Sequence, residues 1–99
     1  MGSRLDLQTL LETLVDHVYF QPPESKKIEY PCIRYERNDS IPLYADNKPY
    51  MVVWGYQVIV IDQNPDSLIP EQIANLPLCK FERHYTADNL NHDVFNLYY

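Results

Sequence analysis

The sequence predicts an α+β fold in which one mainly antiparallel sheet of about four to five strands carries two helices. Three features predict it: a helical repeat of leucines near the start, several segments with alternating apolar residues, and a short helical segment between prolines. The expected order is α-β-β-α-β-β. The 99 residues suit a single domain, residues 1–99, and 45% apolar residues with only two glycines indicate an ordered chain.

Residues 4–17 have the spacing of an amphipathic helix. Leucine and valine recur mostly at three- and four-residue steps from Leu5 to Val18. Ser3 is a good N-cap and Asp6 lies in the first turn, where the helix dipole favours an acid. We expect this helix to end near His17.

Three segments alternate like strands. Residues 18–20 are a short β-like piece, and residues 31–37 should place Ile33 and Tyr35 on one face. The strongest strand is residues 50–62, where the residues that share a face are Val52, Trp54, Tyr56, Val58 and Val60. We expect Trp54 to pack in the core between the sheet and the first helix. A bulge or a close approach is expected at Gly55.

The second half begins with a short helix that Ser67 or Asp66 caps, that runs to about Asn75 and that Pro77 ends. Residues 79–86 then alternate, with Cys79, Phe81 and Tyr85 on one face. Residues 87–92 should turn the chain. The last strand is residues 93–99, and its shared face holds Phe95, Leu97 and Tyr99.

Residues 38–49 form a loop or extended arm between the first two main strands. The segment is longer than a tight hairpin requires, so we expect a contact element, against the alternative of a plain linker. Nine tyrosines exceed what one small core uses, and some of them should lie at interfaces. The candidate subunit or partner interface consists of Leu43, Tyr44, Asp46, Asn47, Lys48 and Tyr50.

Charge and composition argue against several functions. The net charge is −6, with eight basic residues scattered among fourteen acids, so tight DNA binding is not expected. No apolar run approaches the ~20 residues of a membrane span. Cys32 and Cys79 are expected to be reduced, buried and small, as in a cytoplasm.

Catalytic motifs are not found in the sequence. His84, His92 and Asp93 flank one predicted turn, and Cys79 is the candidate fourth member of this cluster. Metal ligation needs three or four converging ligands at suitable spacing, and this spacing is not suitable. We therefore expect a structural protein without catalytic residues, metal or cofactor.

Three segments resemble small proteins of tailed bacteriophages: residues 18–25 (Val-Tyr-Phe-Gln-Pro-Pro-Glu-Ser), residues 30–33 (Tyr-Pro-Cys-Ile) and residues 85–95 (Tyr-Thr-Ala-Asp-Asn-Leu-Asn-His-Asp-Val-Phe). The family is that of tail terminator, tail completion or head–tail joining proteins. The resemblance implies a homo-oligomeric ring, typically a hexamer, in the neck of the virion. Such a ring assembles in the host cytoplasm, ends growth of the tail tube, and contacts the tube protein and the head-completion protein.

Other functions remain open from the sequence. A head-closure or stopper protein of the same neck region has a similar size and composition. A small Cys/His enzyme and a monomeric binding module are the alternatives from other classes. If the chain forms a ring, DNA passes through without specific binding, and acids should line the channel. The candidates are Glu24, Glu29, Asp39 and Asp46.

Overall fold

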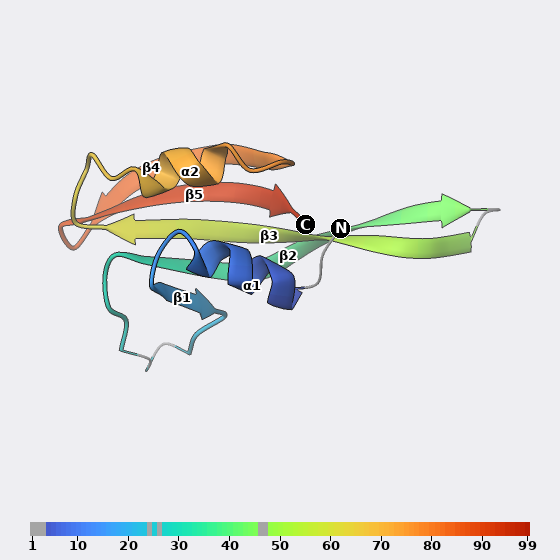
Figure 1. The fold of residues 1–99 in the computed structure, drawn as a ribbon, viewed down its shortest axis with the longest axis horizontal. Helices are drawn as coiled ribbons and strands as arrows, with labels where there is room; N and C mark the ends of the chain where they lie inside the picture. The colour runs from blue at the N-terminus through green and yellow to red at the C-terminus, as the bar shows by residue number, and fades with distance from the viewer. Residues whose placement is uncertain (1–3, 24, 26, 46–47) are drawn as a thin grey trace.

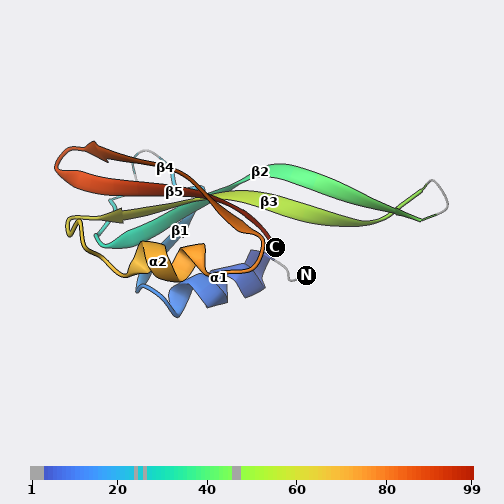
Figure 2. The same ribbon diagram turned by 90° about the horizontal axis from the view of Figure 1, so that it is seen from above.

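The protein is an α+β domain with two helices on one face of a five-stranded sheet (Figures 1 and 2). The computed structural model describes residues 4–23, 25, 27–45 and 48–99, and between 41 and 52 it describes the backbone alone. The strand order is β1-β2-β3-β5-β4, and only β1 and β2 pair in parallel. The elements are α1 (Arg4–Glu12), β1 (His17–Phe20), β2 (Cys32–Ala45), β3 (Lys48–Asp62), α2 (Ile69–Ala74), β4 (Cys79–Ala87) and β5 (Leu90–Tyr98). The predicted fold class is confirmed.

Helix α1 is shorter than its apolar spacing predicts. It ends at Glu12, and the amide groups of Thr13 and Leu14 donate to carbonyls three residues back, which tightens the last turn. Val15 still packs in the core, so the apolar repeat continues although the helix has ended. His17 begins β1 instead of ending the helix, because the aromatic and β-branched residues after it favour a strand.

Two details of the helix ends were also predicted. Asp6 lies in the first turn of α1 as expected, whereas Ser3 lies outside the described residues. Helix α2 begins at Ile69 after the N-cap residue Leu68, which makes no side-chain capping bond, while the Ser67 hydroxyl accepts from the Ile69 amide. In the part of the chain that the structure describes, no helix is long and apolar enough to cross a membrane.

The core lies between the two helices and the sheet. Tyr35 and Tyr56 are its largest fully buried side chains, and their rings meet edge to face with centroids 6.0 Å apart. The Tyr35 hydroxyl donates to Gln8 and accepts from Arg4, which ties α1 to β2. The apolar side chains that complete this cluster are Leu7, Leu11, Val15, Ile33, Val58, Val60, Ile73, Phe95 and Leu97.

Trp54 is not in this core, so its predicted position is wrong. It shares a face of β3 with the buried Tyr56, but its side chain is 39% exposed. The pairing of β3 with β5 stops at Gly55, and Trp54 lies beyond it, where the sheet narrows to two strands. The guanidinium of Arg37 lies over the Trp54 ring at 4.2 Å and shields it in place of the helices.

Strand β4 does not alternate as predicted along its whole length. Phe81 pairs with Phe95 and Arg83 pairs with Val94, so Glu82 is an extra residue in a β-bulge. The bulge reverses the alternation, and Tyr85 lies on the opposite face from Phe81. The turn after β4 is tighter than predicted, because Asp88 and Asn89 adopt positive φ angles of 54° and 62° in a two-residue hairpin.

Strands β2 and β3 continue beyond the body as a two-stranded arm (Figure 2). Their pairing runs on to Ala45 and Lys48, while β1 ends opposite Tyr35 and β5 ends opposite Gly55. The arm gives the molecule its longest dimension of 51 Å. Within the predicted connection 38–49, the described residues 38–45 and 48–49 belong to paired strands and form an extended arm. In the described part of the chain, no third strand pairs with the outer part of the arm.

Candidate interaction surfaces

The root of the arm is fastened by a close contact across three strands. The Tyr98 hydroxyl on β5 donates to the Asp39 carboxylate on β2 at 2.7 Å, passing over Gly55 on β3. A Cβ atom at Gly55 would lie 2.8 Å from the Tyr98 ring and 2.9 Å from the Asp39 Cβ, so the contact requires glycine. This confirms the close approach predicted there. The hydrogen bond from Tyr98 lowers the pKa of Asp39, and the pKa of Tyr98 is raised by the same bond.

The register of the arm changes at the same place. Arg37 pairs with Tyr56 and Asp39 pairs with Gly55, which leaves Asn38 as an extra residue on β2. A bulge bends and twists a strand, so the position of Asn38 sets the direction in which the arm leaves the body. The Asp39–Tyr98 hydrogen bond lies directly beside this bulge and holds it against the C-terminal strand.

The predicted interface residues lie in the outer arm. The backbones of Leu43 and Tyr44 belong to β2, and those of Lys48 and Tyr50 belong to β3. Asp46 and Asn47 lie outside the described residues. In this segment Leu43 pairs with Met51 and Tyr44 with Pro49, and a second register shift falls between these pairs.

Two of the four predicted channel acids, Glu29 and Asp39, lie among the described residues, in different parts of the fold. Glu24 and Asp46 lie outside the described residues. Glu29 lies beside β1, where its carboxylate is 3.3 Å from His17 Nε2 and its amide donates to the Tyr19 hydroxyl. Asp39 is at the arm root, bound to Tyr98. Which of them faces a channel stays a prediction about the assembly.

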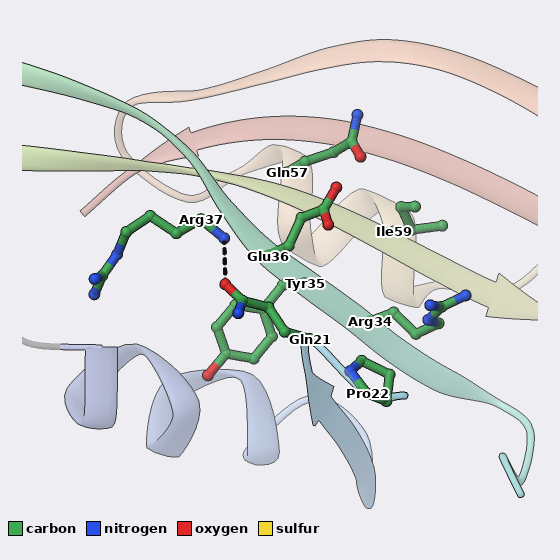
Figure 3. A pocket seen from close by; sticks show the side chains of 8 residues that line it. All are labelled: Gln21, Pro22, Arg34, Tyr35, Glu36, Arg37, Gln57 and Ile59. Atoms are coloured by element: carbon green, nitrogen blue, oxygen red, sulfur yellow. Dashed lines mark hydrogen bonds between the residues drawn. The ribbon is translucent and has the colours of Figure 1, made fainter. Parts of the chain in front are cut away.

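One face of the sheet has no helix on it (Figure 2). A polar hollow of about 490 Å³ opens where β1 ends and the edge of β2 becomes free (Figure 3). Arg34, Glu36 and Gln57 line it. At the edge of β2 beyond the end of β1, the Gln21 side-chain oxygen accepts a hydrogen bond from the Arg37 amide at 3.3 Å. Arg34 Nε is buried there without a hydrogen-bond partner. Opposite charges line this hollow together, so it has no clear preference for either sign of ligand.

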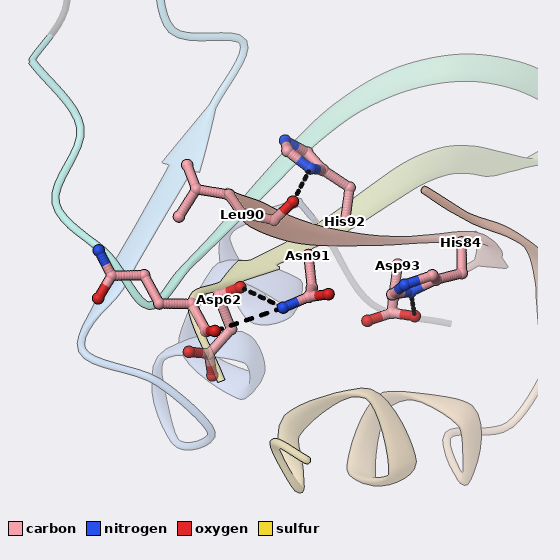
Figure 4. Close-up of polar contacts among 7 residues, drawn as sticks. Asp62, His84, Leu90, Asn91, His92 and Asp93 are labelled. Atoms are coloured by element: carbon pink, nitrogen blue, oxygen red, sulfur yellow. Dashed lines mark hydrogen bonds and ion pairs between the residues drawn. The ribbon is translucent and has the colours of Figure 1, made fainter. Parts of the chain in front are cut away.

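The predicted His/acid cluster is divided by the sheet. His84 Nδ1 is 2.7 Å from the Asp93 carboxylate, and these two residues pair directly on the helix-covered face (Figure 4). His92 pairs with Tyr85 on the other face, where their rings stack with centroids 4.6 Å apart. Cys79 pairs with Leu97 at the far end of β4. Among the described residues there is no group of three or more His, Cys, Asp or Glu side chains placed to hold a metal ion.

The cysteines are poorly suited to nucleophilic chemistry. Burial raises the pKa of the Cys32 thiol to about 11, with the neighbouring Arg34 opposing that rise. Burial also raises the pKa of Cys79. A nucleophilic cysteine needs a thiolate at neutral pH, and both shifts disfavour the thiolate. The two thiols are free, as the sequence predicts, although Cys79 is only half-buried.

Comparisons of the chain with protein-family models, with curated proteins and with solved structures give no match. The interaction surfaces therefore have to be interpreted from their own geometry. Sequence reasoning found the arm, but it missed the fastening of the arm root by Asp39 and Tyr98. Gly55, one of two glycines in the chain, was the signal for that contact, and pairing of β3 with β5 identifies its partner.

Proposed function

We propose that the chain is a subunit of a homo-oligomeric ring, hexameric in the manner of the family that it resembles, that ends the tail tube of a tailed bacteriophage. The observation that carries the assembly role is the arm. Within the residues that the structure describes, its outer strands pair with each other and with no third strand, and two-stranded ribbons are marginally stable in water without further packing. An arm with apolar and aromatic residues along it is therefore best explained by a surface outside its own chain.

The sheet edges support the same role. Strand β4 forms one edge, and all but the first of its nine residues are exposed. Strand β1, the other edge, has only four residues. Exposed edges present free backbone groups that another chain can pair with. A head-to-tail contact between two different surfaces of identical subunits closes only under cyclic symmetry, which gives a ring.

The placement in a virion rests on the resemblance of residues 18–25, 30–33 and 85–95 to tail terminator proteins. In that role the ring contacts the tail tube protein on one side and the head-completion protein on the other. DNA passes through it without specific binding, for which the net charge of −6 is suitable. In this function the chain is not an enzyme and needs no cofactor.

The test is end-specific binding to tail tubes. The purified chain, carrying a gold label on a C-terminal tag, is mixed with tubes polymerised from the tail tube protein encoded nearest to it. Electron microscopy should show label at one end of each tube, and capped tubes should stop growing when more tube protein is added. Label along the tube walls, unchanged tube growth, or a monomeric chain in purified virions would each refute the proposal.

A further inference from the structure

An apolar hollow lies beside the root of the arm. Leu10 on α1 forms one wall, and the connection from α2 to β4 forms another with Leu76, Pro77 and Leu78. The end of the chain closes it with Leu97, Tyr98 and Tyr99. No charged side chain lines the hollow, although more than a fifth of the residues of this protein are charged.

Leu78 is the unusual residue of this hollow. Its side chain is 65% exposed, and its φ angle of 58° lies in the left-handed region, which glycine, asparagine and aspartate adopt more readily than leucine. Its carbonyl accepts from the Tyr98 amide at 3.1 Å, so the backbone is fixed in this conformation. Neither the turn nor the core requires leucine here. A contact with another molecule explains an apolar side chain held outward at such a position.

The size of the hollow suits protein side chains. Its volume is about 250 Å³. Pockets for small molecules commonly have about 300–1,000 Å³. A hollow of this size, open and apolar, accommodates one or two large apolar side chains from a partner.

The outer arm is the candidate occupant, because among the described residues its two strands pair with each other and with no third strand. Residues 41–45 and 49–54 contain no charged residue and include Leu43, Tyr44 and Tyr50. At about 3.3 Å per residue, the seven residues from Asp39 to Ala45 reach roughly 20 Å beyond the root. The arm points away from its own body, so it does not return to its own hollow (Figure 2).

We propose that the apolar hollow around Leu78 receives the arm of a neighbouring copy of this chain. Two acidic copies repel each other unless the surfaces that meet are uncharged, and both the hollow and the sides of the arm meet that condition. The contact joins two different surfaces, so each copy both gives an arm and receives one. The inference rests on the proposed assembly and names the contact that forms it.

The test uses two variants that each remove one side of the contact. Leu78→Asp places a charge in the hollow at a backbone conformation that aspartate tolerates, and Leu78→Asn is an uncharged second variant. Leu43→Asp combined with Tyr44→Asp places a charge at two consecutive positions of the arm strand β2. Leu68→Asp is the matched control, since Leu68 is 68% exposed and does not line the hollow. Circular dichroism checks that every variant is folded.

The measurement is the mass in solution by sedimentation equilibrium. The wild-type chain and the control should form species several times heavier than 11.8 kDa, while the hollow variant and the arm variant each remain at 11.8 kDa. In a mixture, the hollow variant supplies an intact arm and the arm variant supplies an intact hollow. One copy of each can therefore join, and the remaining hollow and arm of that pair are both altered. The mixture should yield heterodimers and nothing larger. That result would not follow from a general loss of stability.

Three results would overturn the inference: hollow variants that assemble like the wild type, a mixture that remains monomeric, or a wild-type chain that is monomeric at about 1 mM. At that concentration even an association with a millimolar dissociation constant is detected. The outcome is separable from that of the proposed function. Self-assembly through the hollow without binding to tube ends would refute the phage role alone. Tube-end binding that survives Leu78→Asp would refute the hollow alone.

Discussion

Two aromatic residues on one face of β3 should differ sharply in their contribution to stability. Tyr56 is 1% exposed and Trp54 is 39% exposed, although they are only two residues apart. Replacing Tyr56 by alanine leaves a cavity in a packed core, which typically costs about 3–5 kcal/mol for a large aromatic side chain. Trp54→Ala leaves no enclosed cavity. It removes the Arg37 stack, worth about 0.5–1 kcal/mol at exposed sites, and some partly buried area, so we expect a loss of about 1–2 kcal/mol.

The assay is urea unfolding followed by circular dichroism, because removing the single tryptophan also removes its fluorescence. A two-state fit gives the free energy of unfolding of each variant at pH 7. Val58→Ala is a control at a fully buried position of the same strand face. Equal losses for Trp54→Ala and Tyr56→Ala would show that Trp54 belongs to the core and that our account of where the helices stop covering β3 is wrong.

Three further predictions follow from the arm root and the cysteines. Gly55→Ala should lower the free energy of unfolding by about 1–3 kcal/mol in the same assay, because the added methyl overpacks against the Tyr98 ring, and an unchanged midpoint would contradict that contact. Tyr98→Phe should destabilise the protein above about pH 4, where the Asp39 carboxylate is ionised, because a charged acceptor makes the stronger bond. The difference from the wild type should shrink as the pH falls through the pKa of Asp39, which the bond holds below 3.8 in the fold. Unfolding curves across pH test this, and a difference that does not shrink as the pH falls below 3.8 would refute it. Cys32 should resist alkylation by iodoacetamide at pH 8 in the folded protein and react fully in urea, because burial raises the pKa of its thiol. Mass spectrometry of the modified peptides measures this, and rapid labelling of the folded protein would contradict its burial.

The periodicity of apolar residues was sufficient to predict the fold class and most of the core. Ile33 and Tyr35 are buried on one face of β2, and Phe95 and Leu97 are buried on one face of β5, as their alternation indicates. The errors occur where a local pattern continues past the element that it describes. Val15 keeps the helical repeat after α1 has ended, and Trp54 keeps the strand alternation after the helices no longer cover the sheet. Sequence spacing records which way a side chain points and not what lies opposite it.

The candidate site was predicted less completely. The length of the segment 38–49 indicated an arm, but its form as two paired strands and its direction depend on the bulge at Asn38 and on Tyr98, which is 59 residues away from Asp39 in the chain. The clustering of His84 and His92 could not be judged from sequence either. The register of the β4–β5 hairpin, in which His84 pairs with Asp93 and Tyr85 with His92, places them on opposite faces.

The sequence by itself determined the composition of each layer, because burial of apolar side chains at periods of two and 3.6 residues is a local requirement that every strand and helix must meet. It also determined the acidic net charge and the absence of charged residues from positions 41–45 and 49–54 of the arm. Only the tertiary structure decided which surfaces remain uncovered. The Asp39–Tyr98 contact, the outward position of Leu78 and the apolar hollow beside the arm all depend on which strands become neighbours. That choice is made by packing between residues distant in the chain, and no local pattern encodes it.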